Sequence, residues 1–262
     1  MRCAMAVAAS LRLCFSSLSS SSGHRHRLPS ALYLTAAYRR NAKAAHDAFH
    51  APDWKCSRRG MVAASGADAA GSSGVIKIAA ISGSLRRASF HAGMIRAAIE
   101  IAKENIPDVE IEVLKIGDLP FVNTDLEVDG RFPEVVERFR AKVLQADSIL
   151  FACPEYNYSM SAVFKNSIDW ASRAPNVWAE KPAAIMSAGG NFGGGRSSYH
   201  LRQSGVFCDL RFINKPEVFV RAFEPPAKFD ADGNLIDSAT KDRIKDLLFS
   251  LRSWTLRLKS CS

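Results

Sequence analysis

Three segments of this 262-residue chain combine residue types suited to binding a charged, planar ligand, and the first covers residues 82–89. It reads Ser-Gly-Ser-Leu-Arg-Arg-Ala-Ser and follows a short apolar run. Hydroxyl groups, a guanidinium and backbone N–H groups at the start of a helix bind anions well, because the unpaired amides and the helix dipole favour negative charge. The segment lacks the spacing of a P-loop or of a GxGxxG motif, so it predicts a monophosphate site. The simpler interpretation is a helix capped by Ser89 after a glycine turn.

The second segment, residues 154–159, reads Pro-Glu-Tyr-Asn-Tyr-Ser and leads into Lys-Asn-Ser-Ile-Asp-Trp at residues 165–170. Its proline stiffens the backbone, while the aromatic rings and the amide offer a flat apolar surface with polar edges. This combination suits one side of a planar ring system. Alternatively, the two tyrosines pack on the neighbouring helix.

The third segment, residues 187–196, has five glycines within seven positions. Glycine removes side chains where the backbone must come close to a ligand, and its amides can then point at that ligand. Hinges and mobile lids have the same composition, so this segment is not decisive by itself. Three such segments after three apolar runs nevertheless favour one shared site, and a mononucleotide such as FMN carries both the monophosphate and the ring.

The elements that must position these segments alternate along the chain after residue 74. Unbroken apolar runs predict buried parallel strands, alternation at 110–115 predicts an edge strand, and apolar residues at 3.6-residue spacing predict helices. Five strands and five helices give a doubly wound parallel sheet with helices on both faces. Its expected order is the flavodoxin-like 2-1-3-4-5, with the ligand at the carboxyl ends of the strands. The strands are expected at 75–81, 110–115, 148–153, 183–186 and 217–221, and the helices from about 89, then at 133–146, 161–172, 197–208 and 240–257.

The charge of the chain is unevenly distributed. Residues 1–74 carry ten Lys or Arg and three acids, a net charge of +7, whereas residues 75–262 carry 25 and 23, a net charge of +2. A nearly neutral domain argues against nucleic acid as a partner. No apolar run is long enough to cross a bilayer, so we expect no membrane span. The six cysteines show no CxxC pair or metal-ligand spacing, so neither a disulfide framework nor a metal site is expected.

Residues 1–74 are rich in Ala, Ser and Arg and contain no acid before Asp47. This composition is typical of an organelle transit peptide, so we expect a leader and linker at 1–74 and a folded domain at 75–262. A plastid is the first choice of destination and a mitochondrion the second. Translation from Met61 would give a cytosolic form without the leader, and a disordered tail without any address is the simpler alternative.

Taken together, the three segments make the chain resemble the NADPH-dependent FMN reductase family. Within that family, the chain is most similar to plant NAD(P)H:quinone oxidoreductases and to bacterial chromate or quinone reductases. The resemblance covers roughly residues 75 to 260, and the stretch Pro-Glu-Tyr-Asn-Tyr-Ser followed by Lys-Asn-Ser-Ile-Asp-Trp is its most specific part.

The resemblance implies which residues bind FMN. The first segment would hold the phosphate, the second would lie along the isoalloxazine ring, and the third would lie near the other side of that ring. The family usually has Asn where this chain has His91, whose imidazole can still donate to phosphate, and commonly has Pro and a small residue in place of Met160 and Ser161. The implied cofactor-binding residues are Ser82, Ser84, Leu85, Arg86, Ser89, Phe90, His91, Pro154, Glu155, Tyr156, Asn157, Ser187, Ala188, Gly189 and Gly190.

The implied activity is NAD(P)H:quinone oxidoreduction in a ping-pong cycle, with FMN as the cofactor and NADPH or NADH as the co-substrate. Because the flavin carries the chemistry, no catalytic acid/base pair is expected, and His200 and Cys153 are more simply structural. Chromate, azo dyes and free flavin are alternative acceptors. The resemblance also implies a homodimer or homotetramer, since Arg196, Tyr199 and Glu217 match positions that tend to lie at subunit contacts in the bacterial enzymes. Alternatively, these three residues belong to the solvated surface. A flavodoxin-type electron carrier and a flavin-binding regulatory protein are the competing functions.

Overall fold

β1 (Ile76–Ser82), β3 (Ser148–Ala152) and β6 (Pro182–Gly189) are buried over most of their lengths in the computed structural model, which describes residues 74–260. Their Ile, Leu, Ala and Phe side chains follow one another without alternation, as suits strands covered on both faces. β2 (Val109–Leu114) has buried ends and a more exposed middle, and it lies at the edge of the sheet beside β1. The strands run parallel in the order β2-β1-β3-β6-β7.

Two short strands share the fifth position of this sheet. β7 (Arg211–Phe212) pairs with the start of β6, and β8 (Val218–Arg221) pairs with its end. The segment between them leaves the sheet. The expected order 2-1-3-4-5 is therefore confirmed, and β7 is a strand that the sequence analysis did not predict.

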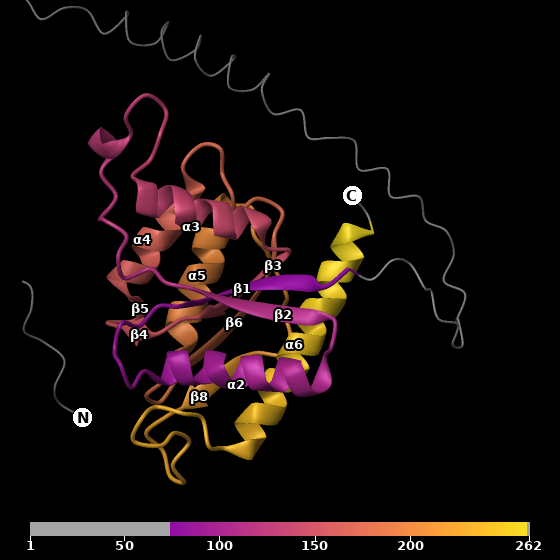
Figure 1. Ribbon diagram of the computed structural model, residues 1–262. Coiled ribbons are helices and arrows are strands. Elements are labelled where there is room, and N and C mark those ends of the chain that lie inside the picture. The colour runs from indigo at the N-terminus through magenta and orange to yellow at the C-terminus, as the bar shows by residue number, and fades with distance from the viewer. Residues whose placement is uncertain (1–73, 261–262) are drawn as a thin grey trace, which may run out of the picture. The chain divides into compact units, whose positions relative to one another are not determined.

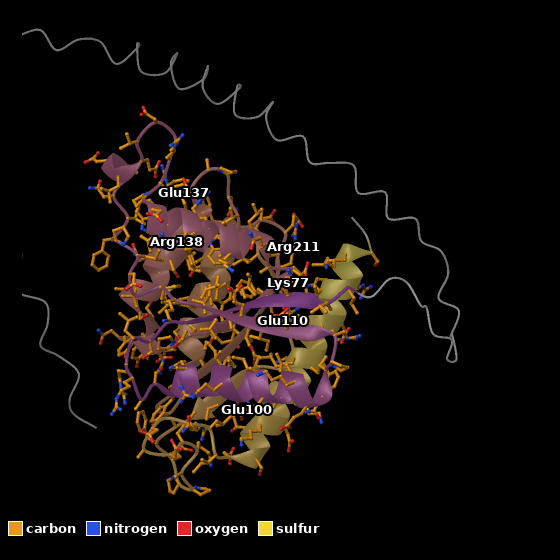
Figure 2. The ribbon with its side chains drawn as sticks, viewed as in Figure 1. Lys77, Glu100, Glu110, Glu137, Arg138 and Arg211 are labelled. Carbon is orange, nitrogen blue, oxygen red and sulfur yellow. The ribbon has the colours of Figure 1, made fainter. Side chains whose placement is uncertain are left out.

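Helices cover both faces of the sheet (Figure 1). One apolar cluster joins α2 (Phe90–Asn105) and α6 (Ser238–Lys259) to one face. A second cluster joins α3 (Glu134–Gln145), α4 (Ala162–Ser172) and α5 (Gly195–Phe207) to the other. The charged residues labelled on these helices in Figure 2, Glu100 on α2 and Glu137 and Arg138 on α3, are exposed. The doubly wound architecture expected from the sequence is thus confirmed.

Local sequence signals explain where the helices begin. Ser89 caps α2, since its hydroxyl accepts a hydrogen bond from the Ala92 amide at 3.3 Å. Ser161 caps α4 by accepting from the Phe164 amide at 3.4 Å, and Asp237 caps α6 by accepting from the Thr240 amide at 2.9 Å. Pro133 precedes the first turn of α3, where its missing N–H removes nothing.

The connection from β8 to α6, residues 222–237, folds back onto the start of α2. At Gly93 the approach is so close that an added Cβ would lie 1.8 Å from the carbonyl oxygen of Gly233. The Arg96 guanidinium donates to the Asn234 side-chain oxygen from Nε at 2.9 Å and from Nη2 at 2.6 Å. The connection therefore supports α2, the helix that follows the first of the three loops.

Within residues 74–260, no helix combines the length and the apolar character that crossing a bilayer requires. The same residues contain no cluster of three His, Cys, Asp or Glu side chains that could hold a metal ion. The leader expected at 1–74 lies almost wholly outside the described residues.

Candidate mononucleotide site

The three loops meet on the side of the sheet where the parallel strands have their carboxyl ends. Ser82, the last residue of β1, lies opposite Ala152, the last residue of β3. β6 and β8 extend three residues further, where Gly189 lies opposite Arg221, so all four strands end on the same side of the sheet. Gly83 packs so closely on the second loop that a Cβ would lie 2.5 Å from Cδ of Pro154. The structure therefore brings the sequence-predicted segments together where parallel α/β sheets bind ligands.

The first loop presents polar groups toward solvent at the start of α2. The Ser84 amide donates to the Ser82 hydroxyl at 3.3 Å, and the Arg86 amide donates to the Ser84 hydroxyl at 3.4 Å. Leu85, Arg86 and Arg87 are exposed. Neither guanidinium is ion-paired to a residue within 74–260, and that of Arg86 donates only to the Ala88 carbonyl at 3.4 Å. Two positive charges beside a helix N-terminus therefore have no carboxylate partner and can attract an anion.

The second loop is a hairpin that the sequence analysis did not predict. β4 (Glu155–Tyr156) and β5 (Ser159–Met160) pair antiparallel around Asn157 and Tyr158. Both turn residues are left-handed, with φ of 49° and 67°. A two-residue turn of this kind matches the twist of the strands, and Asn is a preferred residue at its first position. Its second position usually holds glycine, so Tyr158 costs conformational free energy here. Its missing Asn-Gly signal is why the hairpin was not recognised.

The third loop uses its glycines to turn tightly into α5. Gly193 and Gly194 have φ of 58° and 84°, and an added Cβ on Gly194 would lie 2.7 Å from Cβ of Ser187. The Ser187 hydroxyl is buried and donates to the Gly193 carbonyl at 2.8 Å. Gly190, in contrast, has nothing within 4 Å of an added Cβ. Gly190 therefore faces open space, whereas Ser187 and Ala188 are buried and support the loop from within.

Glu155 and Arg196 join the second loop to the third. The Glu155 carboxylate accepts from the Arg196 amide at 3.0 Å and from its guanidinium Nη1 at 3.1 Å. The guanidinium carbon lies 3.8 Å from the ring centroid of Tyr158 and 3.6 Å from that of Phe192. Sequence reasoning placed Glu155 along the ligand and Arg196 at a subunit contact, and it did not pair them.

His91 is buried between the second and third loops. Its Nε2 atom accepts a hydrogen bond from the Ala188 amide at 3.1 Å, and the ring is also hydrogen-bonded to the backbone of Cys153. Burial lowers the pKa of His91 from 6.5 to about 4, against smaller opposite effects of these hydrogen bonds. The imidazole is therefore neutral near pH 7, and it ties the start of α2 to the ends of β3 and β6.

Phe90 and the connection 222–237 form an aromatic cluster beside the first loop. The rings of Phe90 and Phe229 stack with centroids 4.3 Å apart, and Phe223 meets Phe90 edge-on at 5.9 Å. This support was not predicted, because Phe90 and Phe229 are far apart in sequence and Phe229 lies in no recognisable motif.

Cys153 and His200, the two other residues that the sequence analysis considered, are placed as follows. Cys153 is fully buried, and that burial raises the pKa of its thiol to about 12, so it stays protonated at neutral pH. His200 is exposed on α5, where Nδ1 lies 3.0 Å from the Ser159 hydroxyl. Tyr199 donates to Glu217 of the same chain at 2.8 Å.

A doubly wound parallel sheet with a phosphate-suited helix N-terminus, an aromatic hairpin and a glycine-rich loop at one edge defines the class of flavodoxin-like mononucleotide-binding proteins. The sequence assigns the chain to one family within this class. A family model described as NADPH-dependent FMN reductase matches residues 76–224, and the chain belongs to that family.

Relatives match over most of their own lengths. A protein of Arabidopsis thaliana named NADPH:quinone oxidoreductase is 64% identical over 185 residues, which are 71% of this chain and 94% of that protein. An NAD(P)H-dependent FMN reductase of Pseudomonas aeruginosa is 45% identical over 186 residues, 70% of this chain and 97% of the relative. Among solved structures, the flavoenzyme NAD(P)H:(acceptor) oxidoreductase FerB of Paracoccus denitrificans has a TM-score of 0.62 at 29% identity, covering 70% of this chain and 98% of FerB.

Proposed function

We propose that this protein is an FMN-dependent NAD(P)H:quinone oxidoreductase. Family membership, and relatives named for this activity at up to 64% identity, support the proposal. When bound, FMN would accept a hydride from NADPH or NADH and pass two electrons to a quinone. The protein's own task is then to bind the cofactor, orient it and leave one ring face open to each substrate in turn.

The residues at the site fit this cofactor. The phosphate would lie at the start of α2, beside the hydroxyls of Ser82 and Ser84 and the exposed guanidinium of Arg86, which has no carboxylate partner within residues 74–260. The ring would lie between the hairpin, including Tyr156 and Asn157, and the backbone at Gly189 and Gly190. Ser89, Phe90 and His91 would support the phosphate loop from behind, since all three are occupied by contacts within the protein.

The open space at Gly190 is the observation that carries this assignment of the site. A methyl group at this position touches nothing, so Gly190→Ala should leave the fold intact while obstructing a ligand that approaches the backbone. We expect the purified chain to be yellow, to oxidise NADPH only when benzoquinone is present, and to lose FMN affinity about tenfold in Gly190→Ala. A colourless chain without affinity for added FMN would contradict the proposal.

A flavodoxin-type electron carrier is the alternative function. Such carriers are usually strongly acidic so that they dock basic partners, whereas residues 75–262 carry 25 basic and 23 acidic side chains. The same assay separates the two functions, because rapid NADPH oxidation without a partner reductase excludes a carrier.

We further propose that the protein forms a homodimer or homotetramer through α5. The outer face of this helix exposes large apolar side chains, with Tyr199, Val206 and Phe207 exposed to 53%, 81% and 88%. Exposed apolar side chains gathered on one helix favour contact with a second copy.

For the leader, we propose import into a plastid, with a mitochondrion as the second choice. The basic, Ser-rich and acid-poor composition of residues 1–74 supports it. A fluorescent protein fused after residue 74 should accumulate in plastids of plant cells, and a fusion that starts at Met61 should stay in the cytosol. Cytosolic fluorescence from both fusions would contradict import.

A further inference from the structure

The N-termini of α2 and α5 both lie at the candidate site, and they differ in the charged groups beside them. At α2 neither Arg86 nor Arg87 forms an ion pair within residues 74–260, and the Arg86 guanidinium donates only to the Ala88 carbonyl, at 3.4 Å. At α5 the Arg196 amide already donates to the Glu155 carboxylate at 3.0 Å. A protein carboxylate thus occupies the position that a ligand phosphate would otherwise take.

The Glu155 carboxylate accepts hydrogen bonds from both the backbone and the side chain of Arg196. Its Oε2 accepts from the Arg196 amide, and its Oε1 accepts from the guanidinium at 3.1 Å. The two side chains are only 15% and 28% exposed, so solvent and salt screen this pair less than an ion pair on the open surface. Because Glu155 lies on the hairpin and Arg196 follows the glycine-rich loop, the pair fixes one loop against the other.

Aromatic rings enclose the same guanidinium from both loops. Tyr158 belongs to the hairpin turn and Phe192 to the glycine-rich loop, and their ring centroids lie 3.8 and 3.6 Å from the guanidinium carbon. Contacts of this kind attract the cation to the ring faces. They also give a reason for the left-handed backbone of Tyr158, whose φ of 67° presents its ring to Arg196 at a conformational cost.

We propose that Glu155 and Arg196 form a positioning latch, held by Tyr158 and Phe192, that closes the glycine-rich loop onto the hairpin and sets the width of the flavin-binding gap. The role in FMN binding rests on the proposed function, whereas the closure of the loop does not. In this arrangement Glu155 acts through Arg196 and is a positioning residue.

Hydrogen exchange of the cofactor-free chain tests the closure directly. Glu155→Gln keeps an acceptor for the Arg196 amide but removes the charge, and Arg196→Met keeps the length of the side chain but removes both the charge and the planar group. Both variants should exchange the amides of residues 187–196 about tenfold faster than wild type, the size expected for one charge-assisted hydrogen bond. The control is Glu180→Gln, which removes the charge from a more exposed Glu–Arg pair with Arg211 near the amino-terminal end of β6 and should leave this exchange unchanged.

FMN titration of the same variants tests the consequence for binding. The dissociation constant should rise about tenfold in Glu155→Gln and Arg196→Met and stay constant in Glu180→Gln. If a latch variant does not fold, Phe192→Leu removes one ring alone and should raise the exchange of residues 187–196 severalfold. Unchanged exchange in the folded variants overturns the latch, as does weaker FMN binding without faster exchange. If wild type binds no FMN, the proposed function fails, and the exchange experiment still decides the latch.

Discussion

His91 packs among the loops of the site, and its protonation should influence folding. Because burial lowers its pKa from 6.5 to about 4, the unfolded chain binds more protons than the folded chain between these values. Stability should therefore fall as the pH falls from 6.5 toward 4, by up to about 1.4 kcal/mol per pH unit from this residue. Urea unfolding at several pH values measures this slope.

A matched pair of variants assigns the slope to His91. His91→Asn should flatten the pH dependence of the unfolding free energy in this window. His200→Asn, which changes an exposed histidine on α5, should leave it as steep as in wild type. An equally steep slope in both variants would show that His91 is not responsible.

Cys153 should be chemically inert in the folded protein. Burial raises the pKa of its thiol to about 12, and alkylation requires an accessible thiolate. We expect iodoacetamide at pH 8 to leave the peptide containing Cys153 unmodified until urea unfolds the chain, as followed by peptide mass mapping. Modification of this cysteine in the native protein would instead indicate an opening at the end of β3.

The sequence predicts the residue types of the site better than their individual tasks. Ser89 was expected as a helix cap, and the structure confirms that hydrogen bond. The partners of Glu155 and His91 could not be predicted, because Glu155 meets a residue 41 positions away and His91 meets one 97 positions away. Side-chain pairs of that separation depend on how whole elements pack, which a local pattern does not contain.

At the level of elements, the brace of residues 222–237 on α2 should be sensitive to one methyl group. In Gly93→Ala the new Cβ would lie 1.8 Å from the Gly233 carbonyl oxygen, so the helix and the connection must separate. The steric cost should exceed the helix propensity gained from alanine and lower stability by about 1–3 kcal/mol. Urea unfolding measures the change.

Gly190→Ala is the control for this prediction. Its added methyl group meets nothing within 4 Å, so the unfolding free energy should stay close to that of wild type. Equal stability of wild type and Gly93→Ala would mean that the connection does not bear on α2 in solution.

The helices and strands that the sequence predicts well are those with a long periodic or uniformly apolar pattern. The five expected helices and the central strands are present, with ends within a few residues of those expected. β4, β5 and β7 contain only two residues each, too few for any periodicity. The hairpin also lacks the glycine that marks such turns, so only the folded chain reveals it.

At the level of the whole molecule, the exposed face of α5 should determine the oligomeric state. Phe207→Asp places a charge on a side chain that is 88% exposed in the single chain, and it should shift the protein toward monomer. Light scattering coupled to gel filtration measures the mass. The same change at Leu144 of α3, which is 63% exposed, should leave the assembly intact. A wild-type protein of single-chain mass would contradict the proposed contact.

The division of the fifth strand into β7 and β8 protects the molecule from fibril-like stacking. An uninterrupted border would offer a foreign peptide a ladder of free amides and carbonyls, whereas here each strand contributes only two or four residues before the chain turns away. On the opposite border, β2 carries the exposed charged residues Glu110 and Glu112, the second of them ion-paired with Lys142 at 2.9 Å, and charged side chains on an edge strand disfavour pairing with another strand. Both edges of the sheet are thus poor templates for aggregation.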